Sequence, residues 1–105
     1  MMAQGALIWC PFPDAEAART AICVLLDEHL IACGNILPGV ESLFAWQGAR
    51  TEGAECGALL KTSAAGMDIA IARLEAIHPY DVPVIGGWRV AGPPATAGWL
   101  ASEIS

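Results

Sequence analysis

Residues 40–62, VESLFAWQGARTEGAECGALLKT, hold two extended apolar segments around a turn, and this stretch decides the fold. Residues 40–46 are rich in Val, Leu, Phe and Trp, which favour β-strands, and residues 55–62 form a second such run. Residues 48–53 between them are largely polar and bounded by glycines, which is typical of a turn. The sequence therefore predicts a β-hairpin whose first strand begins near Cys33 and is kinked before the first of the two runs.

On the N-terminal side of this hairpin, the pattern predicts a strand followed by a helix. Residues 5–10 (GALIWC) are a short apolar run ended by Pro11 and Pro13, which fits a buried strand. Asp14 can cap a helix, and apolar residues then recur at helical spacing as far as about Leu30.

On the C-terminal side, the pattern predicts a helix, a strand and a further helix. Thr62 or Ser63 can cap the first of these, which Pro79 ends. Residues 82–90 form the strand, in which two adjacent glycines indicate a bulge or a close approach of another element. Residues 96–104 can form a short last helix.

The order of these elements is β-α-β-β-α-β with an extra C-terminal helix, in one domain spanning residues 1–105. Right-handed crossovers then predict an α+β fold, a ferredoxin-like sandwich with strand order 4-1-3-2 and both main helices on one face of the sheet. The other face would stay bare, and residues 43–46 carry apolar groups on both sides of their strand. We therefore expect this surface to be covered by further copies of the chain.

Composition excludes several kinds of partner. Hydrophobic residues make up 55% of the chain, and charged residues make up 15% where about 25% is usual. The net charge is −6 and the five cations are scattered singly, which argues against nucleic acid. The longest uninterrupted apolar run, residues 21–26, is far too short to cross a bilayer. Nothing resembles a signal peptide, so we expect a cytoplasmic protein with four free, core-facing cysteines.

Three motifs then resemble one family. Residues 32–48 (ACGNILPGVESLFAWQG) resemble the signature of the CutA family, the divalent-cation tolerance proteins, as do Glu55, the pair at residues 61–62 (KT) and residues 78–83 (HPYDVP). The motifs follow the order and spacing of the family, and the similarity runs over residues 7–100.

This resemblance implies a homotrimer with a PII-like architecture, in which long hairpins cross subunit boundaries. It also implies a link to copper and other divalent cations. The chain departs from the family pattern at Phe44, where Tyr is usual, and at Val84, where Glu is common.

The expected topology brings a small group of reactive side chains together. The first strand runs antiparallel to both of its neighbours, so its end at Cys10 should lie near Glu55, His78 and Asp81. A thiolate and an imidazole suit Cu(I) or Zn(II), and the family's proposed metal ligands fall on Cys10 and His78. The alternative is structural: Cys10 fills the core as a small apolar group, and His78 caps the second helix.

Four further residues are candidates for binding a small ligand. Trp46 and Tyr80 could line a cleft for a planar group, or they could anchor a subunit interface. Glu55 and Lys61 could form a polar pocket, or they could form an ion pair between subunits.

The function we predict is that of a CutA-type cytoplasmic homotrimer that supports tolerance of copper and other divalent cations by binding them. The alternative is a PII-like sensor or scaffold that takes a small ligand or a protein partner in clefts between subunits. We expect no enzymatic activity, because the sequence has no nucleophile-base pair, phosphate loop or His-Glu-x-x-His pattern.

Overall fold

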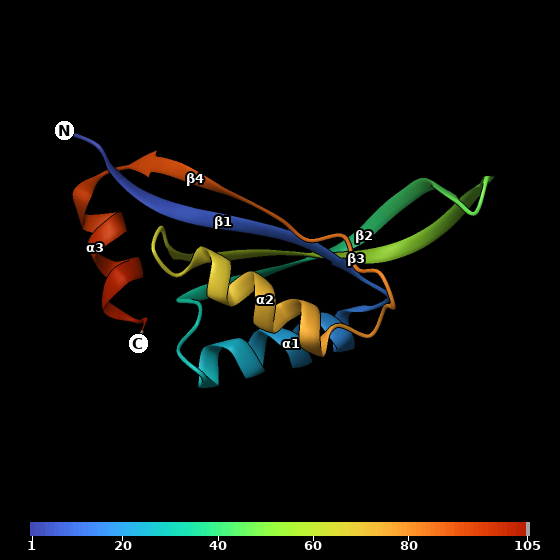
Figure 1. Ribbon diagram of the computed structural model, residues 1–105, viewed down its shortest axis with the longest axis horizontal. Helices are drawn as coiled ribbons and strands as arrows, with labels where there is room; N and C mark the ends of the chain where they lie inside the picture. The colour runs from blue at the N-terminus through green and yellow to red at the C-terminus, as the bar shows by residue number, and fades with distance from the viewer. Residues whose placement is uncertain (105) are drawn as a thin grey trace.

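The computed structural model describes residues 1–104 and contains a four-stranded antiparallel sheet with three helices (Figure 1). The elements are, in chain order, β1 (Ala3–Phe12), α1 (Ala15–Asp27), β2 (Cys33–Trp46), β3 (Ala49–Ser63), α2 (Met67–Ile77), β4 (Gly86–Gly92) and α3 (Pro94–Ser102). The strand order is β2-β3-β1-β4. The predicted α+β fold and strand order are therefore confirmed.

Helix α1 starts as predicted, because the Asp14 side chain accepts a hydrogen bond from the Ala17 backbone N–H at 2.8 Å. Helix α2 does not, since its N-cap is Gly66 and no side chain caps it. The Ser63 hydroxyl instead accepts from the Gly66 N–H, and the buried Thr62 hydroxyl donates to the Leu30 carbonyl at 2.8 Å. Both hydroxyls are engaged before the helix begins, which is why the predicted cap was wrong.

The hairpin is longer than predicted. The chain reverses at Gln47 and Gly48, which have φ of 51° and 81°, and Trp46 pairs directly with Ala49. Two consecutive positive φ values are typical of a tight two-residue hairpin turn, so residues 49–53, predicted as part of the turn, belong to β3. The predicted kink is confirmed, because the β2–β3 register shifts between Leu37 and Val40.

The last two elements also begin elsewhere than predicted. Strand β4 starts at Gly86 rather than at Val82, because pairing with β1 starts at the Trp9–Gly86 pair. Helix α3 starts at Pro94, two residues early, since proline suits the first turn of a helix. None of the three helices in residues 1–104 has both the length and the apolar character needed to cross a bilayer.

The core lies between one face of the sheet and helices α1 and α2. Its largest fully buried side chains include Ile8 and Phe12 from β1, Leu60 from β3, Leu25 from α1 and Leu74 from α2. The predicted close approach at the paired glycines is confirmed at Gly87, where a Cβ would lie 2.9 Å from Ile71 Cδ1 of α2.

The opposite face of the sheet, here called the open face, carries exposed apolar side chains. Trp88 is 46% exposed and pairs across the sheet with Leu7, and Leu37 is 39% exposed at the β2 edge. This face is not entirely bare, because α3 packs its buried Leu100 against Gly5 at one end.

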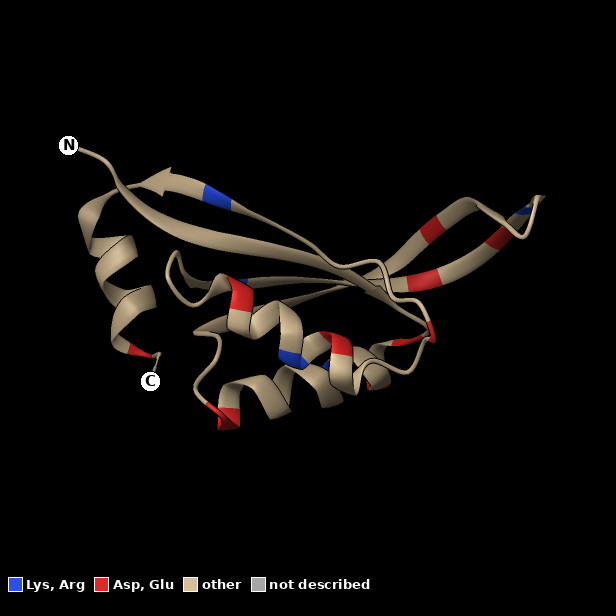
Figure 2. Ribbon diagram, in the orientation of Figure 1, with Lys and Arg blue, Asp and Glu red and all other residues tan. Residues whose placement is uncertain are grey.

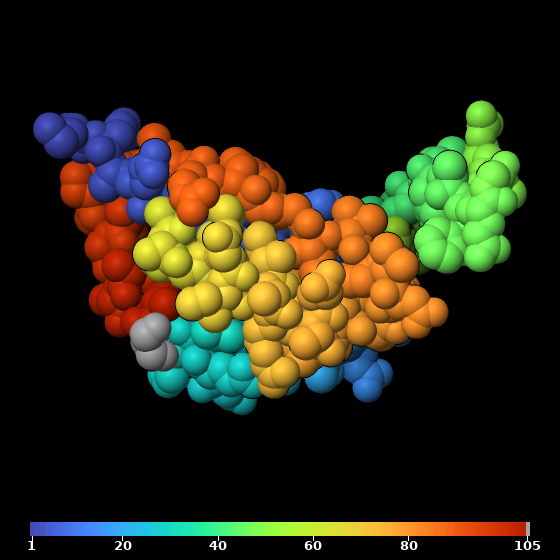
Figure 3. Space-filling view, in the orientation of Figure 1, coloured from blue at the N-terminus to red at the C-terminus, as the bar shows by residue number. Residues whose placement is uncertain are grey.

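The hairpin continues beyond the sheet as a two-stranded arm, which we define as residues 40–55. Strand β1 ends at Phe12, opposite Cys56, so the arm has no third strand (Figure 1). Figure 3 shows the arm projecting away from the body of the molecule. Its side chains Leu43, Phe44 and Trp46 are 45–58% exposed.

The four cysteines are free thiols, but they are not all in the core as predicted. Cys10 and Cys56 are buried, Cys33 is half-buried and Cys23 is exposed on α1. Cys23 follows the buried Ile22 in α1. Because an α-helix has 3.6 residues per turn, adjacent residues point in different directions, and the Cys23 side chain faces away from the sheet.

Candidate functional site

The candidate site lies where β1 ends, where the arm joins the sheet, and where the chain leaves α2. The β1–β3 register pairs Cys10 with Ala58 and Phe12 with Cys56. The end of β1 therefore lies beside the point where β3 begins to pair with β1. The chain segment after α2 brings His78 and Tyr80 to the same place.

His78 is held by both of its ring nitrogens. Nε2 lies 2.9 Å from the carbonyl oxygen of Pro11, and Nδ1 accepts a hydrogen bond from the Tyr80 backbone N–H at 3.1 Å. A carbonyl can only accept and a backbone N–H can only donate, so the hydrogen sits on Nε2 and the lone pair on Nδ1. The ring is 8% exposed and stacks on Phe12 with 4.4 Å between centroids. Its backbone N–H closes α2 on Leu74, which is consistent with the helix-cap alternative.

Tyr80 connects this region to the base of the arm. Its hydroxyl donates a hydrogen bond to Glu55 Oε2 at 2.8 Å, and its ring centroid lies 4.9 Å from that of His78. The pKa of Tyr80 is raised to about 12, mainly by partial burial and to a smaller extent by the hydrogen bond to Glu55 and its negative charge. The phenol therefore stays a donor to the carboxylate at neutral pH.

Cys10 lies deeper than its neighbours and is fully buried among core side chains. Burial, with a smaller effect of the Glu55 charge, raises the pKa of the Cys10 thiol to about 12. The sulfur lies 3.7 Å from the Pro11 carbonyl oxygen. The thiol is therefore protonated at neutral pH, whereas metal coordination requires the thiolate.

The donor chemistry here suits a soft metal ion, but the donors are not free to bind one in the single chain. Sulfur from Cys10 and nitrogen from His78 are ligands that Cu(I) and Zn(II) accept. Within residues 1–104, no group of three or more His, Cys, Asp or Glu side chains is arranged to hold a metal ion. A cation could bind the pair only if the thiol lost its proton and the ring released a hydrogen-bond partner.

The structure brings together only part of the predicted site. Hydrogen bonds link Tyr80 to both Glu55 and His78, and the negative charge of Glu55 contributes to the raised pKa of Cys10. Asp81, in contrast, is exposed and makes no hydrogen bond or ion pair in the described part of the chain.

Lys61 and Trp46 lie elsewhere in the single chain. Lys61 is six residues along β3 from Glu55, about 20 Å at the usual strand rise, and pairs with Leu7 and Cys33. Trp46 is next to the turn at the tip of the arm. These two residues could meet the others only across two copies of the chain.

Sequence reasoning did not identify Pro11 and Phe12 as site residues. Pro11 contributes a backbone carbonyl, a group that every residue carries, so no sequence signal marks it. Phe12 supplies the surface on which His78 stacks, and the predicted strand, residues 5–10, ended before it, whereas β1 extends to Phe12.

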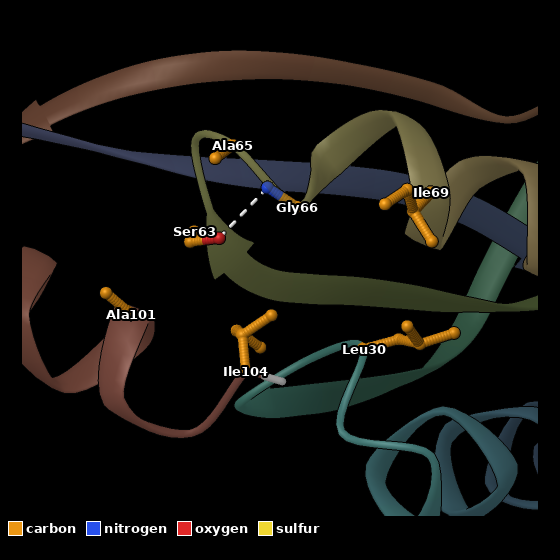
Figure 4. Close-up of a pocket in the computed structure, with 7 residues that line it drawn as sticks. All are labelled: Leu30, Ser63, Ala65, Gly66, Ile69, Ala101 and Ile104. Atoms are coloured by element: carbon orange, nitrogen blue, oxygen red, sulfur yellow. Dashed lines mark hydrogen bonds between the residues drawn. The ribbon is translucent and has the colours of Figure 1, made fainter.

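A cavity of about 260 Å³ lies at the other end of the molecule, between the start of α2 and the end of α3 (Figure 4). It is lined by Leu30, Ser63, Ala65, Gly66, Ile69, Ala101 and Ile104. Its one hydroxyl, on Ser63, already accepts from the Gly66 N–H. The cavity contains none of the predicted site residues and no charged group.

Comparison with known proteins identifies close relatives. A family model described as CutA1 divalent ion tolerance protein matches residues 6–103. A divalent-cation tolerance protein CutA from Thermus thermophilus is 42% identical over 79 residues, which cover 75% of this chain and 77% of that protein. A crystal structure of CutA from Xylella fastidiosa matches with a TM-score of 0.91 and 37% identity, over 96% of this chain and 98% of that one. A structure titled as the periplasmic divalent cation tolerance protein CutA of Archaeoglobus fulgidus matches with a TM-score of 0.90 and 25% identity, over 96% and 99%.

Proposed function

Because the chain belongs to the CutA1 divalent ion tolerance protein family, we propose that it supports tolerance of copper and other divalent cations by binding them, without catalysis. The observation that carries this proposal is the meeting of a thiol, an imidazole and a carboxylate at the end of β1. Cys10 and His78 are the proposed ligands, and Glu55 is the carboxylate whose charge acts on Cys10.

The proposed ligands favour soft ions for a physical reason. Sulfur and imidazole nitrogen bind Cu(I) and Zn(II) in preference to hard ions such as Mg²⁺, which favour oxygen. Binding at Cys10 releases a proton, so the affinity should rise with pH. We expect micromolar or weaker binding by a single chain, because the cation must replace existing hydrogen bonds.

Calorimetric titration with Zn²⁺, and with Cu(I) under reducing conditions, tests this assignment. The Cys10→Ser, His78→Ala double variant should lose the binding heat. The control is a Cys23→Ser, His29→Asn double variant, which removes one thiol and one imidazole from exposed or turn positions. This control should retain the binding heat. Both variants should first show the far-UV circular dichroism of the original protein, and unchanged binding by a folded Cys10/His78 variant would reject these ligands.

We also propose that the working form is a homotrimer. The arm is a two-stranded ribbon with exposed Leu43, Phe44 and Trp46, and such a ribbon is only marginally stable alone in water. The open face adds Trp88 and Leu37. Packing arms and open faces of neighbouring copies would cover both surfaces and could bring Trp46 and Lys61 close to Glu55 and Tyr80. Sedimentation equilibrium tests this proposal, and the expected result is a fitted mass equal to that of three chains.

A second function, that of a PII-like sensor or scaffold, is supported by a different observation. The hydrogen-bonded Glu55–Tyr80 pair is partly exposed and polar at the base of the arm, while the metal donors beneath it are engaged. In this case a small ligand would bind between subunits, with Trp46 and Lys61 supplied by a neighbour. A thermal-shift screen of metabolites separates the two functions, because a specific ligand raises the melting temperature without metal.

A cytoplasmic location is part of the proposal, and it rests on the four free thiols. The Archaeoglobus fulgidus relative is titled periplasmic. Fractionation of cells expressing the full-length protein, followed by immunoblotting, tests the location directly.

A further inference from the structure

The open face of the sheet continues onto one side of the arm, because β3 runs through both. Residues 56, 58, 60 and 62 of β3 are buried toward the helices. Side chains alternate along a strand, so the residues between them face the open side. Glu55, at the base of the arm, and Lys61, in the body of the sheet, are therefore on the same side of β3 as the open face.

Only two charged side chains of the described strands lie on this surface. The register of the sheet aligns Lys61 with three uncharged residues: Cys33, Leu7 and Trp88. Arg89 of β4 pairs with the buried Ala6 and therefore faces the helices. On the arm, the charged residues 41, 50 and 52 alternate with Glu55 and lie on the opposite side. The surface thus carries one cation, Lys61, and one anion, Glu55.

Neither of these charges has an ionic partner within the described residues, where the one ion pair joins Arg73 and Glu28. Both side chains are half-buried, and about 20 Å of β3 separates them, which is too far for them to pair with each other. Glu55 accepts a hydrogen bond from the Tyr80 hydroxyl at 2.8 Å, but that neutral group brings no positive charge. A second copy that covers this surface removes water from both charges, and a buried charge without a partner is strongly unfavourable.

We propose that Lys61 of one copy pairs with Glu55 of the next copy when the chain assembles through the open face and the arm. Because the surface offers one charge of each sign, this arrangement matches every charge and brings no like charges together. It joins the body of one copy to the base of its neighbour's arm, beside Tyr80. The inference rests on the proposed homotrimer, but it does not depend on the proposed cation binding.

The pair sets the register of the contact more than it adds affinity. Apolar side chains such as Trp88 and Phe44 bury similar areas in several relative positions of two surfaces, whereas two charges match in one position. A slip of two residues along a strand, about 7 Å, leaves both charges without a partner. A contact between different regions of two copies is also heterologous, so it repeats from copy to copy until a ring closes.

Charge reversal tests the pair, with sedimentation velocity over a dilution series as the measurement. Lys61→Glu and Glu55→Lys should each weaken association at least about 100-fold, because each brings like charges together. The variant with both reversals restores opposite charges and should associate within about ten-fold of the original protein. Arg19→Glu is the control, because it makes the same change of charge at an exposed position of α1, and its association should not change.

Neutral variants provide a second measurement if a charge reversal disturbs the fold, which far-UV circular dichroism shows first. Glu55→Gln keeps an oxygen that can accept the Tyr80 hydroxyl, and Lys61→Met keeps a long unbranched side chain. If the two residues pair, their losses are not additive. The double variant should associate at least about five-fold more tightly than the sum of the two single losses predicts.

The outcomes separate this inference from the proposed homotrimer. If the original protein assembles and Lys61→Glu associates as tightly as Arg19→Glu, the pair is refuted and the homotrimer stands. If both reversals weaken association, the double reversal does not recover it and the neutral losses are additive, the two charges act separately and the pair is again refuted. If the original protein sediments as a single chain, the homotrimer fails and the pair with it.

Discussion

Burial of ionisable side chains makes the stability of this protein sensitive to alkaline pH at individual residues. The pKa of Cys10 is raised to about 12 from a reference value of 9.0, chiefly by burial, and that of Tyr80 is raised to about 12 from 10.0. The folded state thus holds these protons more tightly than the unfolded state does. The resulting stability is fully present below about pH 9 and is lost as the pH rises toward 12.

We expect the free energy of unfolding to fall between about pH 9 and pH 12, by up to about 1.4 kcal/mol per pH unit for the proton of the buried Cys10 thiol. Urea unfolding measured across this window is the test. Cys10→Ala should flatten the dependence, whereas Cys23→Ala, at an exposed thiol, should leave its slope unchanged. An identical slope in all three proteins would contradict the assignment to Cys10.

At Gly34, the absence of a side chain is a packing requirement. A Cβ at this position would lie 2.7–2.9 Å from three carbon atoms of Ile22 on α1. Gly34→Ala should therefore lower the free energy of unfolding by about 1–3 kcal/mol through overpacking. Gly53→Ala, where a Cβ would meet nothing within 4 Å, is the control and should cost little. Equal unfolding midpoints in urea for the two variants would show that Ile22 moves aside freely.

At the scale of elements, the arm depends on its two-residue turn. Gln47 and Gly48 both have positive φ, at 51° and 81°, which matches the twist of the flanking strands. Glycine adopts this conformation without steric cost, while other residues pay about 1–2 kcal/mol.

Gly48→Ala should therefore destabilise the arm by about 1 kcal/mol. If the arm joins neighbouring copies, the melting temperature of the assembly should fall and depend more steeply on protein concentration. Gly53→Ala, on the same arm but outside the left-handed region, should leave both quantities unchanged. A melting temperature unaffected by Gly48→Ala would mean that the arm does not contribute to assembly.

The helices are tied together by a surface contact that no sequence pattern marked. The Arg73 guanidinium of α2 donates two hydrogen bonds of 2.8 Å to the Glu28 carboxylate at the end of α1. This contact holds the pKa of Glu28 below its usual range. Because both side chains are about 40% exposed, the pair fixes the relative placement of the helices more than it stabilises the fold.

At the scale of the whole molecule, the single chain is unusually extended for its length. Its dimensions are 46 × 27 × 22 Å and its radius of gyration is 14.3 Å, whereas a compact chain of this size has about 13 Å. The arm accounts for the difference, as Figure 3 shows. Figure 2 shows acidic residues along the arm and the helices, while β1 at the centre of the sheet carries no charge.

If copies of the chain associate through the arm, replacing one of its exposed apolar side chains by a charged one should weaken that association without unfolding the body. Trp46→Glu should weaken the association of subunits at least about 30-fold, because buried aromatic residues often contribute 2 kcal/mol or more to an interface. Sedimentation velocity over a dilution series measures the effect. Ile69→Glu, which charges an exposed apolar position on α2, is the control and should remain assembled. Dissociation of both variants to the same extent would contradict a specific role for the arm.

Much of the architecture could be predicted because it depends on local patterns. Helical spacing located α1 and α2, Asp14 marked a cap, and the order of elements implied the sheet. The predicted ends of strands were wrong where pairing with a distant segment of the chain determines where a strand begins or ends. Residues 49–53 pair with β2 although their sequence resembles a turn, and Val82 belongs to no strand although its surroundings resemble one.

The candidate site was predictable only in outline. Antiparallel pairing was enough to place Cys10, Glu55 and His78 in one region, but it could not show that the His78 ring is engaged on both sides. Lys61 and Trp46 could not be placed relative to Glu55 without the register of β3.

The sequence by itself determined the order of strands and helices, the family, and the apolar character of the arm and the open face, because periodicity, turn residues and motifs are properties of neighbouring residues. Only the tertiary structure decided which hydrogen-bonding group each site residue meets. That choice depends on distances between segments far apart in the chain, such as Pro11 and His78, and on backbone atoms that every sequence shares.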